Sequence, residues 1–223
     1  MKPWVTLDTQ KAPGGGVLTL QSRDGQFVIR VDGRELMSSR THGSEEAMAA
    51  RALARLPTTT PKVLLGGLGL GFTLRAALQL LPKGAAVRVV ELSSAVVRWN
   101  RGALAELSGR ALEDPRVTVD ALDIRTVLKT PGLSYDAILM DVDNGPAALS
   151  APGNSWLYQA GGLGACFASL HPGGTLVTWS ASEDADFLKR LGQAGFTATS
   201  ERVKQGPHSS AWHTLFVGRR PRK

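Results

Sequence analysis

The spacing of apolar and polar positions divides the chain into two parts. Up to residue 36, short runs of β-forming residues are separated by turn residues. These runs are Trp4–Thr9, Val17–Ser22 and Gln26–Val31. A helix is predicted from near Ser44 to Leu56, followed by a linker rich in threonine and proline. We therefore expect a β-hairpin region with its helix over 1–56 and a second domain over 57–223.

After the linker, apolar strands alternate with helices. The predicted strands are Val63–Leu65, Val87–Leu92, Val117–Ala121, Tyr135–Met140 and Thr175–Trp179. The predicted helices are Phe72–Leu81, Ser93–Leu107, Trp156–Leu170 and Glu183–Ala194. A closing hairpin is predicted over Thr197–Lys204 and Trp212–Val217. The pattern indicates an α/β, Rossmann-like fold, whose seven-stranded, mostly parallel sheet is covered on both faces and ends in an antiparallel edge hairpin.

Composition narrows the class of protein. Hydrophobic residues make up 43% of the chain and charged residues 20%, which is typical of a globular protein. No apolar run approaches the roughly 18 residues that a membrane span needs, and the first residues contain no apolar signal-peptide core. The single cysteine, Cys166, excludes an internal disulfide, and no Cys/His spacing suggests a metal site. We expect a cytoplasmic protein that has no membrane partner and no metal.

The net charge of +7 invites a nucleic-acid interpretation, but its distribution does not favour one. Four of the cationic residues stand among the last five positions: Arg219, Arg220, Arg222 and Lys223. We interpret this segment as a solvated basic tail and expect no nucleic-acid partner.

A glycine-rich turn follows the first strand of the second domain. Gly67, Gly69 and Gly71 are spaced G-x-G-x-G, which lets the backbone approach a ligand closely at the start of a helix. Glu91 ends the next strand, where a carboxylate can accept ribose hydroxyls, and Asp123 follows the third, where it can accept from an adenine amino group. The loop has neither a lysine nor the dinucleotide spacing. The pattern therefore favours an adenosine without phosphates, as in S-adenosylmethionine or a relative.

Together these features resemble the spermidine/spermine synthase family and, more generally, class I methyltransferases, from about Val28 to Val217. The segments that carry the resemblance are Val31–Met37, Arg40–Met48, Gly66–Gly71, Val89–Leu92, Leu122–Ile124 and Tyr135–Pro146. The resemblance implies cofactor contacts from Gly66, Gly67, Gly69, Gly71, Glu91, Leu92, Asp123, Ile124 and Asp141. Family members dimerise through their N-terminal strands and sheet edges, which leaves a homodimer open for this chain.

Departures from the family pattern suggest a different reaction. Gly69 stands where family aminopropyltransferases have an aspartate that holds the amine of decarboxylated S-adenosylmethionine, and an unpaired ammonium in a partly buried site is unfavourable. Glu45 replaces a tyrosine of the polyamine channel. We therefore expect an S-adenosylmethionine-dependent methyltransferase acting on a small acceptor such as an amine. One alternative is a polyamine aminopropyltransferase that uses decarboxylated S-adenosylmethionine, and a second is a non-catalytic nucleoside-binding protein.

The expected catalytic groups follow the fourth strand of the second domain. Asp141 or Asp143 can hold a substrate amine and accept its proton, although both residues also fit a turn or a helix cap. The resemblance implies that five residues contact the acceptor: His42, Glu45, Glu46, His208 and Trp212. For these the alternatives are a surface-loop histidine, favourable charge at a helix N-terminus, and packing on the sheet.

Overall fold

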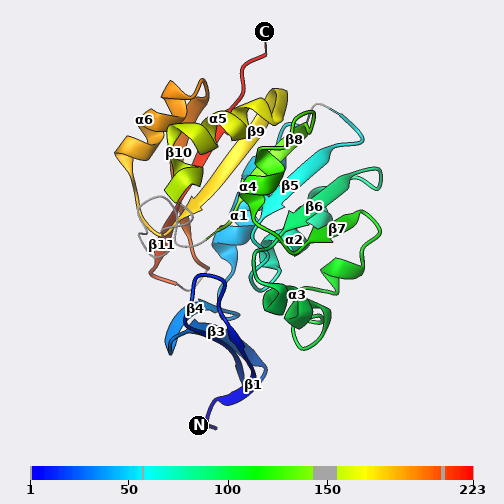
Figure 1. Ribbon diagram of the computed structural model, residues 1–223, viewed down its shortest axis with the longest axis vertical. Helices are drawn as coiled ribbons and strands as arrows, with labels where there is room; N and C mark the ends of the chain where they lie inside the picture. Colours follow the sequence, from blue (N-terminus) through cyan, green and yellow to red (C-terminus); the bar gives the residue numbers. More distant parts are fainter. Residues whose placement is uncertain (1, 57, 143–154, 207–208, 223) are drawn as a thin grey trace.

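The computed structural model describes residues 2–56, 58–142, 155–206 and 209–222, and within them the chain forms two sheets. A small antiparallel sheet near the N-terminus lies beside a larger mixed sheet that is covered by helices (Figure 1). The expected α/β class is confirmed.

The small sheet has four strands in the order β1-β2-β3-β4. They are β1 (Val5–Lys11), β2 (Val17–Arg23), β3 (Gln26–Val31) and β4 (Arg34–Ser38). β4 is absent from the sequence prediction. Asp32 and Gly33 turn the chain from β3 into β4 with φ of 49° and 77°. Two successive positive φ angles are typical of the tight turn that joins hairpin strands.

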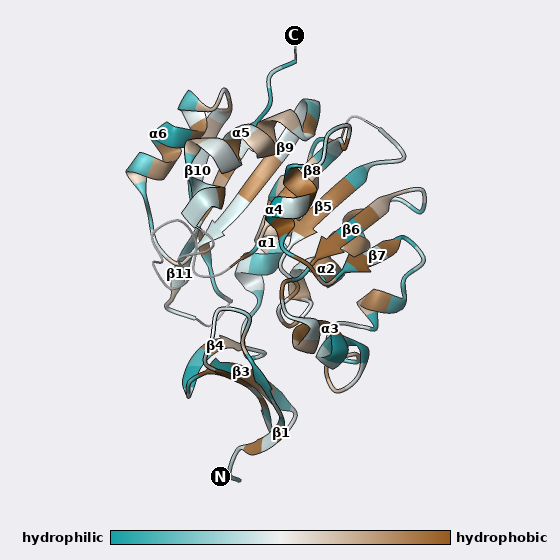
Figure 2. Cartoon of the chain, viewed as in Figure 1, coloured by the Kyte–Doolittle hydropathy of each residue, from teal (hydrophilic) through white to brown (hydrophobic). Residues whose placement is uncertain are grey.

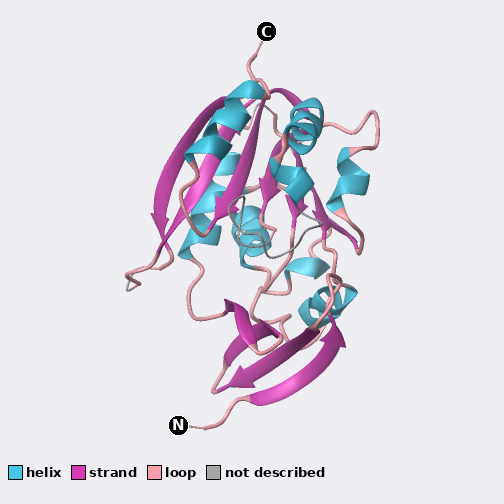
Figure 3. Ribbon diagram, turned by 60° about the vertical axis from the view of Figure 1, so that its left-hand side comes forward, coloured by secondary structure: helices cyan, strands magenta, loops and turns pink. Residues whose placement is uncertain are grey.

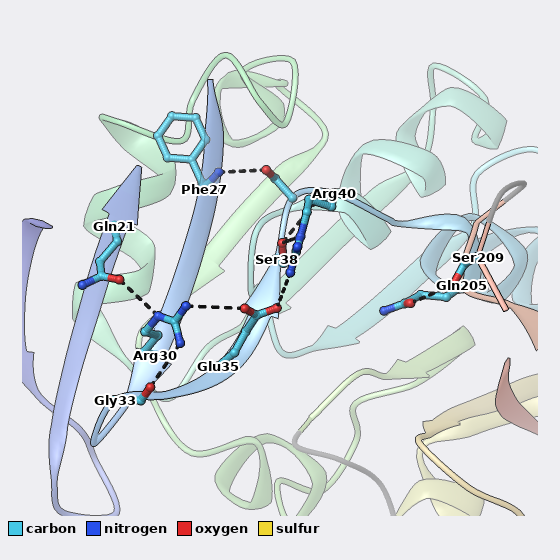
Figure 4. A network of polar contacts seen from close by, with 10 residues as sticks. Gln21, Phe27, Arg30, Gly33, Glu35, Ser38, Arg40, Gln205 and Ser209 are labelled. Carbon is cyan, nitrogen blue, oxygen red and sulfur yellow. Dashed lines mark hydrogen bonds and ion pairs between the residues drawn. The ribbon is translucent and has the colours of Figure 1, made fainter. Parts of the chain in front are cut away.

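A polar network ties the small sheet together (Figure 4). Arg30 on β3 donates to Gln21 Oε1 on β2 at 3.1 Å and lies 3.6 Å from Glu35 on β4. Glu35 also pairs with Arg40 at 3.2 Å, just before the first helix begins. These pairs are half-exposed, so each contributes little stability, but together they favour one register of the strands.

The large sheet has the strand order β10-β11-β9-β8-β5-β6-β7. Its strands are β5 (Lys62–Gly66), β6 (Ala86–Val90), β7 (Val117–Asp120), β8 (Tyr135–Met140), β9 (Leu170–Ser180), β10 (Thr197–Lys204) and β11 (Trp212–Arg219). β11 is antiparallel to both of its neighbours, and the other pairs are parallel. The predicted seven-stranded, mostly parallel sheet with an antiparallel edge hairpin is therefore confirmed.

Helices cover both faces of the large sheet (Figure 3). One face packs against α1 (Gly43–Leu53), α2 (Phe72–Leu80) and α3 (Ser94–Arg101), and the other against α4 (Ile124–Leu128), α5 (Ala160–Ala168) and α6 (Ala185–Gln193). The central strands are apolar along their length (Figure 2) because successive side chains enter opposite cores. Thus Leu65 and Leu139 belong to the α1–α3 core, and Leu64 and Ile138 to the α4–α6 core.

Several element boundaries differ from the predictions. The helix predicted over Ser93–Leu107 ends at Arg101, because Gly102 has φ −122° and ψ −108°. The helix predicted over Trp156–Leu170 is a short 3-10 turn, η2 (Ser155–Tyr158), followed by α5, with the backbone extended at Gln159. β9 already begins at Leu170, which pairs with Tyr135 across an irregularity in the ladder. The short helices α4 and η1 (Ala111–Glu113) are absent from the prediction.

The small sheet and the large domain share one hydrophobic core. Leu18, Leu20 and Ile29 of the small sheet belong to the same buried cluster as Leu68 and Leu70 of the glycine loop. Helix α1 packs on α2 and across β8 to β11. The division at residue 56 stays a prediction. Within the described part of the chain, no helix is long and apolar enough to cross a membrane.

Candidate active site at the ends of β5, β6 and β8

The glycine loop connects β5 to α2 and contacts the end of β8. Gly67 has φ +89°, and a Cβ there would collide with the carbonyl oxygen of Asp141. Only glycine accommodates both this backbone conformation and this approach. The Asp141 amide also donates to Gly66 O at 2.8 Å. The loop and Asp141 are therefore held together as one unit.

The small sheet covers the middle of the loop. A Cβ on Gly69 would lie 3.1 Å from the Met37 sulfur of β4. On the other side, Asn100 of α3 donates its side-chain amide to Gly69 O at 2.8 Å. The missing side chain at Gly69 therefore leaves no open space, because the thioether of Met37 occupies it.

Glu91 and Leu92 follow β6 at the same edge of the sheet. The Glu91 carboxylate accepts hydrogen bonds from the backbone amides of Leu68 and Ser93, each at 2.8 Å. These bonds fix the carboxylate beside the glycine loop. Leu92 is 49% exposed. The pair offers a fixed acceptor and an apolar surface next to each other.

Asp123 and Ile124 follow β7 and have different environments. Asp123 caps α4 by accepting from the Arg125 amide at 2.8 Å, and hydrogen bonds from the Arg125 guanidinium hold the Asp123 pKa below its usual range. Ile124 is buried, and a Cβ on Gly66 would collide with its side chain. The isoleucine side chain therefore supports the loop from beneath.

Two carboxyl groups meet beside the loop. Thr73 in the first turn of α2 donates to Asp141 Oδ2 at 2.6 Å, and burial raises the Asp141 pKa. Glu45 in the first turn of α1 has its pKa raised to about 7, first by burial and then by the negative charge of Asp141. Two acids in one partly desolvated place resist simultaneous ionisation, and a cation bound between them would remove that resistance.

His42 and Glu46 lie next to this acid pair, at the start of α1. The His42 ring stacks on Phe72 with centroids 4.5 Å apart, and its Nδ1 lies 2.8 Å from Glu46, outside hydrogen-bond geometry. Glu46 is half-exposed and 3.7 Å from Arg75 of α2. These two side chains lie near each other and contact α2. The term acid pair therefore refers to Glu45 and Asp141 alone.

Trp212 is not brought into this cluster. By strand alternation Trp212 points to the α4–α6 face, opposite Leu215, and lies beneath Arg202 and Lys204. Asp143 and His208 lie outside the described residues.

Other residues near the acid pair were given no role by the sequence analysis. Ser44 donates to Glu45 Oε2 at 2.5 Å, and the Nδ1 of His213 on β11 lies 3.1 Å from the same hydroxyl. Thr73 anchors Asp141, while Met37 and Asn100 enclose the loop. Only their three-dimensional proximity marks these residues, since no spacing along the chain connects them. Among the residues that the structure describes, no group of histidine, cysteine and acidic side chains is arranged to hold a metal.

Comparison with solved structures identifies the architecture. A spermidine synthase bound to the transition-state analogue AdoDATO matches with a TM-score of 0.80 and 15% identity, over 98% of this chain and 74% of the other. The chain has the spermidine synthase fold. The Thermotoga maritima spermidine synthase matches with a TM-score of 0.77 and 16% identity over the same shares. A probable spermidine synthase from Corynebacterium glutamicum matches with 0.69 and 18%, over 98% and 81%. No family model and no curated protein matches the chain.

This comparison confirms the predicted resemblance at the level of the fold and corrects the predicted reaction. The expectation of a methyltransferase using intact S-adenosylmethionine is wrong, because the solved structures of the spermidine synthase fold that match the chain favour the aminopropyltransferase alternative. The expectation depended on Gly69 leaving the ammonium of the decarboxylated cofactor without a charge partner. Position 69 faces the uncharged thioether of Met37, which gives no preference for a methionyl carboxylate either.

Proposed function

We propose that this chain is a transferase that moves an aminopropyl group from decarboxylated S-adenosylmethionine to a small amine acceptor. The observation that carries the proposal is the acid pair of Glu45 and Asp141 beside the glycine loop. The donor has a sulfonium and an ammonium, and the acceptor is an amine. All three groups are favoured by negative charge in a desolvated site, whereas a carboxylate is not.

In this proposal the glycine loop and its neighbours hold the adenosine. Glu91 accepts from the ribose hydroxyls, Leu92 provides apolar contact for the base, and Asp123 accepts from the adenine amino group. The amides that fix Glu91, at 2.8 Å, make this acceptor rigid before the ligand arrives. A rigid acceptor lowers the entropic cost of binding.

The acid pair performs the chemistry. The nitrogen of a neutral amine forms a bond to the aminopropyl carbon while the carbon–sulfur bond breaks. The electron pair of the broken bond stays on sulfur and neutralises the sulfonium. The nitrogen then gives one proton to the carboxylate pair. Asp141, fixed by Thr73, holds the amine in line, which supplies most of the acceleration in a displacement of this kind. The ammonium of the donor takes the negative charge of the acid pair as its partner in place of a residue at position 69.

The test measures which nucleoside leaves the enzyme. We expect the purified chain, given decarboxylated S-adenosylmethionine and a panel of diamines, to release methylthioadenosine. With intact S-adenosylmethionine and the same amines, we expect no adenosylhomocysteine. Asp141→Asn should abolish release while methylthioadenosine still binds. Binding without turnover across the panel would contradict the proposal and favour the non-catalytic nucleoside-binding protein.

A small-molecule acceptor, a cytoplasmic location and the absence of a nucleic-acid partner complete the proposal. Contacts of the acceptor with His42, Glu46, Trp212 and His208 stay predictions, as do a second catalytic role for Asp143 and a homodimer.

A further inference from the structure

A chain of hydrogen-bonded side chains leads away from Glu45, one member of the acid pair. It begins between Ser44 Oγ and Glu45 Oε2, which lie 2.5 Å apart. From Ser44 Oγ it passes to His213 Nδ1 at 3.1 Å. Ser44 is only 1% exposed, so its hydroxyl meets these two partners rather than bulk water.

His213 stands at the outer end of this chain. Its side chain is only partly buried. The ring packs edge-on against Trp179 of β9, with centroids 4.5 Å apart. That contact restricts rotation of the imidazole and keeps Nδ1 directed at Ser44. The imidazole therefore contacts a buried hydroxyl and is also reached by solvent.

We propose that Ser44 and His213 form a proton relay that carries the proton of the attacking amine from Glu45 to solvent at β11. The inference rests on the proposed function, because that reaction releases one proton per turnover inside the acid pair. Without an exit the pair would stay protonated and could not bind the next cationic donor.

The transfer balances at each group. Protonated Glu45 gives its proton to Ser44 Oγ as the Ser44 hydroxyl proton passes to His213 Nδ1. His213 then releases a proton from its second nitrogen to solvent, and exchange with water restores the ring. Burial lowers the His213 pKa, so the imidazolium, once formed, gives up its proton readily.

The test removes the outer end of the relay and replaces it from solution. His213→Ala should lower kcat on the order of 100-fold with KM little changed, the lower end of the range for a lost proton-transfer group. Added imidazole should restore much of the rate. His213→Gln keeps a polar side chain but cannot carry a proton, so it should be as slow as His213→Ala. His171→Ala, an exposed histidine on β9, is the matched control and should keep the full rate.

Ser44→Ala tests the middle of the chain. It should slow kcat to a similar degree, and imidazole should not restore it, because the gap lies inside the protein. If His213→Ala keeps the full rate, or is slow and insensitive to imidazole, the relay is wrong while the proposed function stands. If the unaltered chain transfers no aminopropyl group, the proposed function fails and the relay fails with it.

Discussion

Glu45 links the stability of the protein to pH. Its pKa rises from 4.5 to about 7 on folding, so the folded state holds this proton more tightly than the unfolded chain does. The resulting stabilisation is complete below pH 4.5 and is lost as the pH rises through 7. Glu45→Gln has no proton to lose. Relative to the unaltered protein, the variant should therefore gain on the order of 3 kcal/mol between pH 4 and pH 8.

Urea unfolding of both proteins at the two pH values measures this difference. Because the comparison is made between two proteins at each pH, the contributions of titrating groups that do not interact with Glu45 cancel. An unfolding free-energy difference that does not change with pH would contradict the raised pKa.

Met37 and Gly69 should be energetically coupled. Gly69→Asp adds a side chain at φ +51° and 3.1 Å from the Met37 sulfur, so we expect a loss of about 1 to 3 kcal/mol. Met37→Ala removes the obstacle but also loses packing. The double variant should therefore lose less stability than the sum of the losses of the two single variants, with a coupling energy of about 0.5 to 2 kcal/mol. Strict additivity in thermal unfolding would show that the two residues do not compete for this space.

The site was only partly predictable from its residues. The glycine loop, Glu91 and Asp141 follow strand ends that the apolar pattern marks, and the structure gathers them at one edge of the sheet. His213 was overlooked in favour of Trp212. Thr214 to Val217 are buried on both faces of the sheet, so no alternation along β11 indicates which of these two neighbours points toward α1. Ser44 and Thr73 were missed because a hydroxyl shows no partner until the fold brings it one.

At the scale of elements, the docking of α1 shows which contacts dominate. Arg51 makes two hydrogen bonds of 2.6 Å to Glu201 on β10, but both side chains are half-exposed. Met48, on the inner face of α1, is fully buried. We expect Arg51→Ala to cost no more than about 1 kcal/mol and Met48→Ala about 2 to 5 kcal/mol.

Denaturant titration of the two α1 variants checks this order. Equal losses, or a larger loss for Arg51→Ala, would mean that the ion pair holds the helix. Salt offers an internal control, because screening should reduce the Arg51→Ala effect and leave the Met48→Ala effect unchanged.

Element boundaries were predictable where a local break coincided with the end of a strand or helix. β8 and β3 match their predictions because turn residues flank apolar runs. β9 does not, since pairing with β8 extends it through Pro172 and Gly173, residues that usually end regular structure. β4 was missed because its side chains are mostly exposed and it is defined by pairing with β3. Tertiary pairing decided both cases.

At the scale of the whole molecule, the shared core predicts how truncated chains behave. A chain starting at residue 57 lacks both the small sheet and α1, which covers β8 to β11. We expect it to be aggregated or to lack a cooperative thermal transition, because large apolar areas become exposed. A chain starting at residue 39 keeps α1 but uncovers Leu68 and Leu70. It should fold with a lower midpoint and bind nucleosides weakly. If the chain starting at 57 melts cooperatively, the predicted boundary marks an independent domain.

One cationic residue near the C-terminus contributes to the net charge of the molecule and also has a structural role. Arg220, interpreted from sequence as part of a solvated tail, donates to the carbonyl oxygens of Phe167 at 2.8 Å and Leu170 at 2.6 Å. It therefore ties the end of α5 to the start of β9. One cation of the basic segment thus has a structural role and is not part of a solvated tail.

The position of β11 between β9 and β10 also has a consequence for biosynthesis. β10 leaves the ribosome before β11, but it can join the sheet only through β11, which lies between β9 and β10. Until β11 is made, β9 and β10 present unpaired backbone edges, and such edges are where nascent chains associate with one another. His213 arrives on that same strand. The last step in completing the sheet therefore also places the imidazole next to Ser44. A chain interrupted before β11 would be prone to aggregation and would lack the relay.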